Sequence, residues 1–412
     1  MIDGRSFVIV GAGMAGARAA ASLRAEGFQG RVVLLGEEHD RPYDRVPLSK
    51  NYLRSEPGYH RLFVHDEGYY AEHDIELRLD TRAASIDVPG REVVLECGER
   101  LAYDRLLLTT GADPRRLRIP GCDLDGVHYL RRTADADRLR YAVTAAEQIV
   151  VIGAGFIGCE VAASARLMGT EVALVGTGEL PMCRALGPET ARFYRDVHAG
   201  HGVEWHLGVG VDALRGGARV EEVVLADGSV LAADAVVVGI GAEPRVELAR
   251  SAGITLDNGI VTDEHLATNV PGIFAAGDVA DAWHPTLGRR LRLEHWSSAL
   301  NQGPEAARNM LGNSTAYSRT PFFFSDQYDV WMEYTGYATE GAEVVFRGDP
   351  APGEAAEFIA FWLREEKLVA GMNVNLKGVP DTISALIRAD LRLDREALAD
   401  PDVELASLLP SS

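Results

Sequence analysis

Two stretches of this chain repeat one pattern: an apolar run, a glycine-rich turn, a helix-forming run and a second apolar run. The first stretch covers residues 7–36 and the second covers residues 149–176, and their glycine turns begin 142 residues apart. Each stretch reads as a strand, a turn, a helix and a further strand. Such βαβ units belong to doubly wound parallel sheets. The repeat therefore predicts an α/β chain with two nucleotide-type domains.

The first glycine turn reads G-A-G-M-A-G at residues 11–16, directly after a predicted strand and at the start of a predicted helix. Gly11 allows a tight turn, Gly13 lets the backbone approach a pyrophosphate, and Gly16 lets the helix pack on the strand. The phosphates then lie at the positive N-terminus of the helix. Glu37 stands 21 residues past the last glycine, where an acid is expected to hold a ribose hydroxyl. This stretch predicts a dinucleotide site.

The second turn reads G-A-G-F-I-G at residues 153–158 and has the same setting. Its ribose contact is ambiguous, because two positions compete for the role. Glu179 has the same 21-residue spacing, whereas alignment of the strands puts Gly176 and Thr177 opposite the glycine and the glutamate of the first unit. No arginine stands in residues 176–183 to receive a 2′-phosphate. The second unit therefore predicts a pyridine nucleotide site that favours NADH, with NADPH possible.

A third motif, G-I-F-A-A-G-D at residues 272–278, places a glycine and an aspartate at the end of a predicted buried strand. The Asp278 carboxylate can hydrogen-bond a polyhydroxyl chain while the following helix N-terminus faces a pyrimidine ring. That pairing suits a flavin better than a nicotinamide. With the first glycine turn, it predicts FAD as the resident cofactor.

Turn clusters and a change of texture predict the domain layout. Clusters at residues 111–114 and 241–244 follow apolar strands and look like crossings between domains. Past residue 321, aromatic-rich strands precede a helix over 382–389, which is typical of an α+β domain with a loose tail. The predicted fold is thus two Rossmann-like domains, for FAD and NAD, plus a C-terminal α+β domain. The predicted boundaries are 1–113 and 243–320 for the FAD-binding domain, 114–242 for the NAD(P)-binding domain and 321–412 for the C-terminal reductase domain.

Charge and cysteine content exclude several classes of protein. The chain has 61 Asp and Glu against 41 Lys and Arg, a net charge of −20, which argues against binding nucleic acid or an anionic membrane. Its four cysteines form no C-x-x-C pair, so neither a disulfide framework nor a metal site is expected. Residues 1–6 lack the cationic start and the apolar region of a signal peptide, so we expect none, and no apolar run approaches the ~18 residues of a membrane span. We expect a cytoplasmic protein.

The motifs together resemble a known family, the FAD-dependent ferredoxin reductases of oxygenase systems, of the putidaredoxin reductase type, within the two-dinucleotide flavoprotein superfamily. The resemblance runs over nearly the full chain, and P-Y-D-R-V-P-L-S-K at residues 42–50 discriminates best. Disulfide reductases of the superfamily carry a redox cysteine near this segment, whereas this chain has none before Cys97. The other motifs that carry the resemblance are T-T-G-A at 109–112, Y-L-R at 129–131, V-G-I-G-A-E-P at 238–244 and S-D-Q-Y at 325–328.

The resemblance implies two candidate catalytic residues and two binding sets. Lys50 matches the lysine near flavin N5, and Glu160 matches the acid that pairs with it close to the nicotinamide. At ~4 Å and an effective dielectric of about 20, a cation attracts the negative charge of a reduced flavin by about 4 kcal/mol. The positions that match FAD contacts are Gly11, Gly13, Ala15, Gly16, Glu37, Arg45, Lys50, Ala83, Arg131, Asp278 and Trp296. Those that match the NAD site are Gly153, Gly155, Ile157, Gly158, Glu160, Glu179 and Gly241.

Two positions depart from the family pattern. Gly176 stands where an acid that marks NADH preference is expected. Phe324 replaces the tryptophan that often precedes S-D-Q-Y, which keeps an aromatic wall without an indole. The first departure bears on the choice of pyridine nucleotide, and the second on any role specific to an indole.

The resemblance implies a redox relay in which NAD(P)H reduces FAD and the flavin passes single electrons to a small 2Fe-2S ferredoxin. The ferredoxin in turn feeds a haem monooxygenase or a Rieske dioxygenase. Alternatives are an NAD(P)H-dependent rubredoxin or quinone reductase, an NADH oxidase, and an apoptosis-inducing-factor-like NADH-binding flavoprotein with little turnover. The acidic segment 382–412 disfavours a membrane quinone reductase, and the missing cysteine near residue 45 disfavours reduction of oxygen or peroxide.

The remaining expectations concern partners and assembly. An acidic ferredoxin needs a basic docking patch on a chain that is itself acidic. Two arginine clusters could provide it, and a monomer and a homodimer are both open. The clusters are Arg115, Arg116 and Arg118, and Arg289, Arg290 and Arg292.

Overall fold

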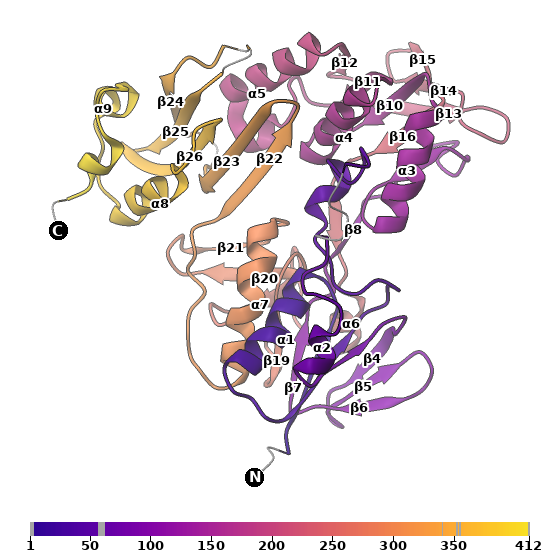
Figure 1. Cartoon of the computed structure of the whole chain (residues 1–412), viewed down its shortest axis with the longest axis vertical. Helices are drawn as coiled ribbons and strands as arrows, with labels where there is room; N and C mark the ends of the chain where they lie inside the picture. The colour runs from indigo at the N-terminus through magenta and orange to yellow at the C-terminus, as the bar shows by residue number, and fades with distance from the viewer. Residues whose placement is uncertain (1–3, 57–61, 340, 352, 354–355, 411–412) are drawn as a thin grey trace. The chain divides into compact units, whose positions relative to one another are not determined.

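The computed structural model describes residues 4–56, 62–339, 341–351, 353 and 356–410 (Figure 1). The chain is a mixed α/β protein with two doubly wound sheets and a C-terminal antiparallel sheet, which confirms the predicted fold class. It divides into two compact units, each built from three separate segments of the chain. Unit 1 comprises residues 1–45, 58–113 and 242–319, and unit 2 comprises residues 46–57, 114–241 and 320–412.

The central sheet of unit 1 is built from five parallel strands in the order β19-β7-β1-β2-β3. β1 is apolar and buried, and it pairs with β2 and β7 on either side, so that Val10 lies opposite Leu35 and Leu108. Helices α1 and α7 pack side by side (Figure 1), because Gly303 lets the backbone of Ala15 approach closely. These elements are β1 (Ser6–Val10), α1 (Met14–Ala25), β2 (Arg31–Leu35), β3 (Ile75–Arg78), β7 (Arg105–Leu108), β19 (Ile273–Ala275) and α7 (Trp296–Met310).

Smaller elements complete unit 1. One antiparallel sheet contains β4 (Ala83–Asp87), β5 (Glu92–Leu95) and β6 (Arg100–Ala102), and another sheet contains β18 (Ile260–Thr262), β20 (Ala280–His284) and β21 (Arg289–Leu291). Strands β8 (Ala112–Pro114) and β17 (Ala242–Pro244) form a two-stranded pair where the chain leaves unit 1 and returns. The two short helices are α2 (Tyr69–Glu72) and α6 (Glu247–Ser251).

Unit 2 repeats the sheet of unit 1 with the order β12-β11-β10-β16-β9, again parallel throughout. The 3₁₀-helix η1 (Val46–Ser49) packs against its helices α3 and α4. The elements are β9 (Val127–Tyr129), α3 (Thr133–Ala145), β10 (Gln148–Ile152), α4 (Phe156–Leu167), β11 (Glu171–Gly176), α5 (Cys183–Gly200), β12 (Val203–Leu207) and β16 (Ala235–Val238). A separate three-stranded sheet contains β13 (Val211–Arg215), β14 (Glu222–Leu225) and β15 (Val230–Ala232).

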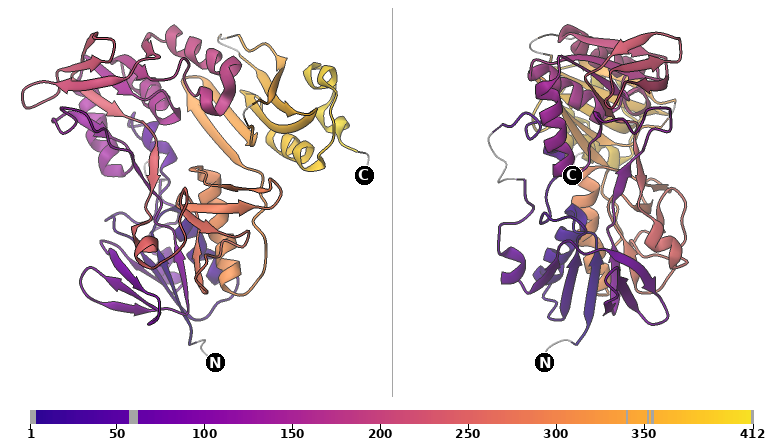
Figure 2. Two further views of the ribbon diagram at one scale, coloured as in Figure 1. Left: turned by 180° about the vertical axis from the view of Figure 1, so that it is seen from behind. Right: turned by 90° about the vertical axis from the view of Figure 1, so that its right-hand side faces the viewer.

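The C-terminal part of unit 2 is an antiparallel sheet in the order β22-β23-β26-β25-β24. Helix α8 covers β23 and β26 (Figure 2), where Gly371 makes room for Ile383. The tail, expected to be loose, instead folds into α9 and η3, which pack leucines on this sheet and helix. The elements are β22 (Phe322–Gln327), β23 (Val330–Gly336), β24 (Glu343–Gly348), β25 (Phe358–Arg364), β26 (Lys367–Val374), α8 (Pro380–Ala389), α9 (Arg395–Ala399) and η3 (Leu405–Leu408).

Candidate functional site

The first glycine turn connects β1 to α1, and each glycine meets a different constraint. Gly11 has φ +116°, and a Cβ placed on it would lie 2.1 Å from the carbonyl oxygen of Thr109. A Cβ on Gly16 would lie 2.0 Å from the carbonyl oxygen of Gly11. Gly13 caps the N-terminus of α1, and a Cβ there would meet nothing within 4 Å. The turn thus fits a pyrophosphate: two glycines close the loop, and the third leaves the helix N-terminus open.

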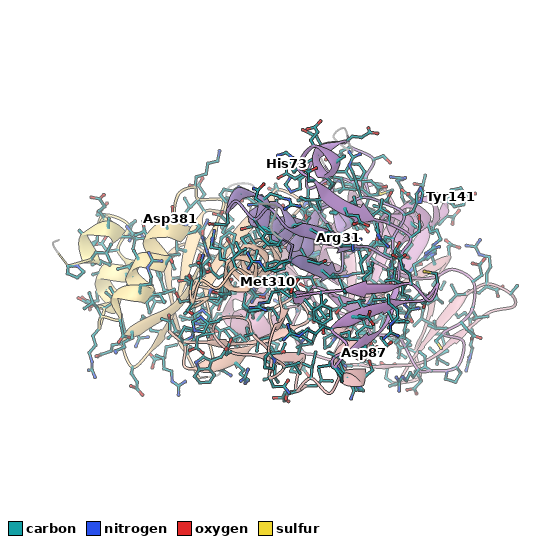
Figure 3. All side chains as sticks on the ribbon, turned by 90° about the horizontal axis from the view of Figure 1, so that it is seen from below. Arg31, His73, Asp87, Tyr141, Met310 and Asp381 are labelled. Atoms are coloured by element: carbon teal, nitrogen blue, oxygen red, sulfur yellow. The ribbon has the colours of Figure 1, made fainter. Side chains whose placement is uncertain are left out.

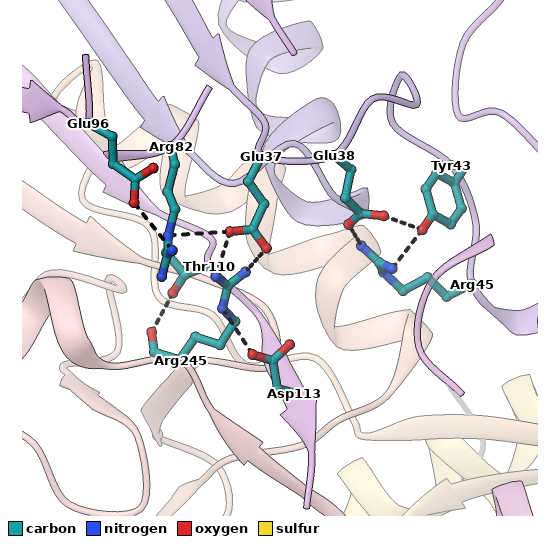
Figure 4. Close-up of polar contacts among 9 residues, drawn as sticks. All are labelled: Glu37, Glu38, Tyr43, Arg45, Arg82, Glu96, Thr110, Asp113 and Arg245. Atoms are coloured by element: carbon teal, nitrogen blue, oxygen red, sulfur yellow. Dashed lines mark hydrogen bonds and ion pairs between the residues drawn. The ribbon is translucent and has the colours of Figure 1, made fainter. Parts of the chain in front are cut away.

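Glu37 follows β2, and its carboxylate is held by an arginine that no sequence motif predicted. Arg245 donates to both carboxylate oxygens, with Nη1 to Oε1 at 2.6 Å and Nη2 to Oε2 at 2.7 Å (Figure 4). Arg82 lies on the other side, with Nε 3.8 Å from Oε2 of Glu37. The bidentate pair fixes the direction of the carboxylate.

Arg245 is itself anchored at both ends. Its backbone N–H donates to the Gly111 carbonyl at 3.0 Å, and the Thr110 hydroxyl donates to its carbonyl at 2.7 Å. Its Nε lies 3.3 Å from Oδ2 of Asp113. Burial acts to lower the pKa of Arg245, but the hydrogen bonds and charge of Glu37, with further carboxylates, raise it overall. The guanidinium is therefore a fixed, charged fork aimed at Glu37.

Arg45 belongs to a second polar cluster in unit 1. Its Nη2 donates to Oε1 of Glu38 at 2.5 Å and its Nη1 donates to the Tyr43 hydroxyl at 2.8 Å (Figure 4). Tyr43 in turn donates to Oε2 of Glu38 at 2.5 Å. Burial acts to lower the pKa of Arg45, but the neighbouring hydroxyl and carboxylates, including that of Asp278, raise it overall. The structure thus brings Arg45 and Asp278 into one electrostatic environment.

The other predicted FAD positions in unit 1 lie on the surrounding elements. Ala15 is buried on α1, and a Cβ placed on Gly277 would lie 3.1 Å from the Cβ of Ala15. Gly277, just before Asp278, has φ +78°, and its N–H donates to Oε1 of Gln302 at 2.8 Å. Trp296 opens α7, while Ala83 is buried at the start of β4. Ala15 and Asp278 therefore lie close together, and Ala83 sits on a separate sheet.

The second glycine turn, between β10 and α4, repeats the geometry of the first. Gly153 has φ +114°, and a Cβ on it would lie 2.3 Å from the Gly239 carbonyl oxygen, while a Cβ on Gly158 would lie 1.9 Å from the Gly153 carbonyl oxygen. A Cβ on Gly155 would meet nothing within 4 Å. This cradle also fits a pyrophosphate.

The strand registers settle which residues correspond between the two units. Val175 pairs with Ile152 as Leu35 pairs with Val10, so Gly176 corresponds to Gly36, and the exposed Thr177 corresponds to Glu37. A Cβ on Gly176 would lie 2.9 Å from the Cβ of Ala154, which explains why a glycine stands there.

The remaining pyridine nucleotide positions, and one FAD position, also lie in unit 2. Ile157 is 48% exposed on the first turn of α4. Glu179 is exposed in the loop after β11. Gly241 has φ +102°, and its carbonyl accepts from the backbone N–H of Arg115 at 2.9 Å. Arg131, the FAD position, precedes α3, and its N–H donates to Oδ2 of Asp135 at 3.2 Å. Exposure leaves Ile157 and Glu179 accessible to a ligand.

Lys50 and Glu160 form a buried ion pair in unit 2, with Nζ 3.1 Å from Oε1. Both side chains are less than 10% exposed. Nζ also lies 5.3 Å from the ring centre of Phe324, within the range of a cation–π contact. The motif 42–50 is divided between the two units: Arg45 belongs to unit 1, whereas η1 and Lys50 belong to unit 2.

Glu160 accepts hydrogen bonds from two serines as well as from Lys50. The Ser49 hydroxyl donates to Oε2 at 2.5 Å, and the Ser325 hydroxyl donates to Oε1 at 2.7 Å. Ser325 accepts from Nε2 of Gln327 at 3.0 Å, and Oε1 of Gln327 lies 2.7 Å from Nε2 of His198. A carboxylate with three donors is well compensated for burial.

Several of these polar partners were not predicted from the sequence, among them Arg245, Ser49, Ser325, Gln327 and His198. Ser49 and Gln327 stand inside motifs that carried the resemblance, so the motif itself was the available signal. Arg245 directly follows the V-G-I-G-A-E-P turn, but nothing local points to a carboxylate 208 residues away. His198 had no sequence signal, because its partner Gln327 is 129 residues away.

The two arginine clusters differ in how far their side chains are engaged within their own unit. Arg115, Arg116 and Arg118 are all exposed in unit 2. In the other cluster, Arg290 Nη1 donates to the carbonyls of Thr262 and Asp281. Arg292, with a side chain only 8% exposed, pairs with Glu294. Arg290 and Arg292 are thus partly engaged within unit 1, while Arg289 and Arg290 remain exposed.

The described residues contain neither a cluster of metal-binding side chains nor a helix suited to cross a membrane. No group of three or more His, Cys, Asp or Glu in the described part of the chain is placed to hold a metal ion, and the four cysteines are free. Among those residues, no helix combines the length and apolar content that crossing a membrane requires. The aromatic side chain of Tyr141 on α3 stands out from the surface, at 78% exposure (Figure 3).

Comparison with known proteins places this geometry in a family context. A family model described as pyridine nucleotide-disulphide oxidoreductase matches residues 5–303, and one described as reductase C-terminal matches residues 322–409. The chain is 40% identical to the ferredoxin–NAD(+) reductase component of the anthranilate 1,2-dioxygenase system of Burkholderia cepacia, over 98% of this chain and 99% of that protein.

Solved structures give the same result for the fold. The ferredoxin reductase for the CYP199A2 system of Rhodopseudomonas palustris has a TM-score of 0.94 at 36% identity, covering 98% of this chain and 99% of that one. The covalent putidaredoxin reductase–putidaredoxin complex also has a TM-score of 0.94, at 33% identity and 98% coverage of both chains. The similarity extends over both units and the C-terminal sheet.

Proposed function

We propose that this chain, which belongs to the pyridine nucleotide-disulphide oxidoreductase family, carries electrons from NADH through FAD to a small 2Fe-2S ferredoxin that serves an oxygenase. The observation that carries the proposal is the full-length similarity to reductases of oxygenase systems, at 40% and 36% identity in two cases. The paired glycine cradles, the buried Lys50–Glu160 pair and the lack of any cysteine before Cys97 support the same function.

FAD is the cofactor of unit 1, and the residues there fit it. Gly13 leaves an open helix N-terminus for the pyrophosphate, and Glu37 is pre-oriented by Arg245 for ribose hydroxyls. We assign Asp278 and Arg45 to the isoalloxazine half of the cofactor, because a carboxylate and a guanidinium lie near one another there. When bound, FAD accepts the electron pair of NADH and returns electrons singly, chemistry that protein side chains do not supply.

NADH is the reductant, and unit 2 is assigned to bind it. Gly155 provides the second open helix N-terminus, and Ile157 presents an apolar face beside it. No arginine follows β11 within residues 176–183, so the chain offers no obvious partner for a 2′-phosphate in that segment. Glu179 and Gly241 remain assigned to the same nucleotide.

The Lys50–Glu160 pair is assigned to the reacting end. Lys50 supplies a positive charge that favours negative charge gathering on the cofactor, while Glu160 and its serine donors fix the ammonium in place. Burial of both side chains keeps water away and strengthens their field. The cation thus acts by preorganised electrostatics, and neither residue is assigned as a general acid or base.

The ferredoxin docks on a local basic surface, for which we choose Arg115, Arg116 and Arg118. All three are exposed, and Arg116 is additionally held over the ring of Tyr129 at 4.0 Å. The free cysteines agree with a reducing compartment, so we place the protein in the cytoplasm. Assembly as a monomer or a homodimer stays a prediction.

The proposal is tested by anaerobic reduction followed by transfer to an acceptor. We expect the purified protein to show a flavin spectrum, to bleach with NADH faster than with NADPH, and to reduce a 2Fe-2S ferredoxin catalytically. A protein that bleaches but reduces none of a panel of ferredoxins would instead support the low-turnover NADH-binding role. A protein that cannot be loaded with FAD would overturn the proposal.

A further inference from the structure

Beyond the Lys50–Glu160 pair, unit 2 contains a run of buried polar side chains that has no assigned role. It begins at Tyr328, in the turn between β22 and β23, and ends at Glu160 on α4. We call it the donor chain. Its members in order are Tyr328, His198, Gln327 and Ser325.

The orientation of the Gln327 amide decides in which direction the hydrogen bonds of the donor chain run. Its Nε2 lies 3.0 Å from the Ser325 hydroxyl oxygen and 3.7 Å from the Met182 sulfur. Its Oε1 lies 2.7 Å from Nε2 of His198. The Ser325 hydroxyl gives its one hydrogen to the Glu160 carboxylate, so it can only accept from Gln327, and the Met182 sulfur has no hydrogen to offer a carbonyl either. The amide nitrogen therefore faces Ser325, and the carbonyl faces His198.

The rest of the direction is set by that amide. Because Oε1 of Gln327 only accepts, Nε2 of His198 must carry the hydrogen. His198 is fully buried, and burial lowers its pKa to about 4, so the ring is neutral at pH 7 and its Nδ1 is an acceptor. The Tyr328 hydroxyl, 3.3 Å away, donates to it. Ser325 accepts from Gln327 and gives its own hydrogen to Glu160.

Every donor in the chain thus points towards Glu160, and none points away. We propose that the donor chain holds the Glu160 carboxylate against Lys50, which makes its members positioning residues for flavin reduction. This inference deepens the proposed function and rests on it. The chain is a support rather than a proton conductor, because a proton on Ser325 would meet an amide nitrogen, which is not an acceptor.

The Tyr328 end of the donor chain is fixed by its backbone conformation and by the packing of its ring. Tyr328 has φ +58°, a conformation that a bulky residue rarely adopts. Its ring stacks on His201 with centroids 3.7 Å apart. A residue persists in such a conformation only where its surroundings over-determine it. The strained turn therefore holds the first donor in place.

The first test reads the direction of the chain without turnover. Two-bond ¹H–¹⁵N spectra of the FAD-loaded protein, assigned with a His198→Asn variant, report which ring nitrogen carries hydrogen. We expect the neutral Nε2–H form at pH 7. The Nδ1–H form or the imidazolium would reverse the chain and overturn the proposal, whether or not NADH reduces the flavin.

The second test measures flavin reduction by NADH in the stopped flow. Ser325→Ala removes one hydrogen bond to a charged group and should slow reduction about tenfold, with KM for NADH unchanged. Ser325→Thr keeps the hydroxyl and should restore most of the rate. Tyr328→Phe, at the far end, should slow it about threefold. The control is Tyr194→Phe on the same helix as His198, where the buried hydroxyl has no hydrogen-bond partner among the described residues, and reduction should be unchanged.

A double variant separates positioning from general packing. In a Lys50→Met background, Ser325→Ala should cause little further loss, since its effect passes through the ion pair. If the two losses simply multiply, the donor chain does not act on Lys50 and the proposal fails. If Lys50→Met slows reduction while Ser325→Ala does not, the proposal fails and the proposed function stands. If NADH reduces no form of the protein, the proposed function itself fails.

Discussion

The two glycine turns have the same backbone conformation. The two units differ in the residue that directly follows Gly36 in one and Gly176 in the other. Gly11 and Gly153 have φ values of +116° and +114°, and Gly36 and Gly176 each face an alanine Cβ within 3 Å of where their own Cβ would stand. At the next position, one unit has Glu37, clamped by Arg245, and the other has the exposed Thr177.

This difference matches the two kinds of ligand. A cofactor that stays bound benefits from an acid whose direction is fixed before binding, because less ordering remains to be done when the ligand arrives. A reductant must leave after each turnover, so a site without a clamped acid suits it. The backbone cradle therefore specifies a dinucleotide, and the residue after the strand sets how firmly it is held.

The strongest test of this difference between the units replaces Gly13 and Gly155, the two glycines at which a Cβ would meet nothing within 4 Å. Valine at Gly13 or Gly155 meets no neighbouring atom at its Cβ, so the fold should survive in both variants. We expect Gly13→Val to weaken FAD binding about 100-fold, measured by titrating the apoprotein, because its side chain would occupy the place of the pyrophosphate. Gly155→Val should keep FAD and raise KM for NADH to a similar extent. Equal effects of both variants on both ligands would contradict the comparison.

Acidification should affect unit 2 through His198. Its folded pKa of about 4 lies below the unfolded value near 6.5, so between these values the unfolded chain binds more protons and stability falls as pH falls. The loss should be about 2 kcal/mol from pH 6.5 to pH 5, with the full contribution present above pH 6.5. Urea unfolding at several pH values measures it. A His198→Gln variant should show a flatter pH dependence; an unchanged slope would contradict the assignment.

Exchanging the residues after the strands tests what they contribute. Glu37→Gln removes the carboxylate that Arg245 holds by two hydrogen bonds and should weaken FAD binding about tenfold, measured by fluorescence of released flavin. Thr177→Glu should raise KM for NADPH about tenfold relative to NADH, because the new carboxylate would repel a 2′-phosphate. If Thr177→Glu changes neither constant, position 177 does not correspond to position 37 in function.

The smallest expected effect concerns the ferredoxin. Arg118→Glu should raise KM for ferredoxin about threefold at low salt and less at high salt, with KM for NADH unchanged. Arg192→Glu changes the net charge equally at another exposed site of unit 2 and serves as the matched control. Equal effects of the two variants would mean that total charge, rather than the patch around Arg118, governs docking.

Sequence alone predicted the parts of the site that depend on local geometry. A tight turn, a helix N-terminus and a close helix–strand contact each demand glycine within a few residues, so the six-residue pattern identified both cradles. The fold class came from the same repeat. The cofactors came from the turns together with the family resemblance.

The remainder depended on contacts between distant residues. Arg245 reaches Glu37 across 208 residues, and Ser325 reaches Glu160 across 165, distances at which no local pattern carries information. The tail was expected to be loose, yet Leu393 and Leu398 are buried, and further leucines of the tail pack against the same cluster. The many acidic residues of this segment obscured the leucines that pack against the C-terminal sheet and α8.

The pairing of β8 with β17 has a consequence for how freely the chain between them can vary in length. Gly111 accepts a hydrogen bond from Arg245, so the strand that leaves unit 1 and the strand that re-enters it are neighbours. A loop whose ends already meet can be lengthened at little entropic cost. The length of the segment 114–241 can therefore change without moving the ends of β8 and β17 apart.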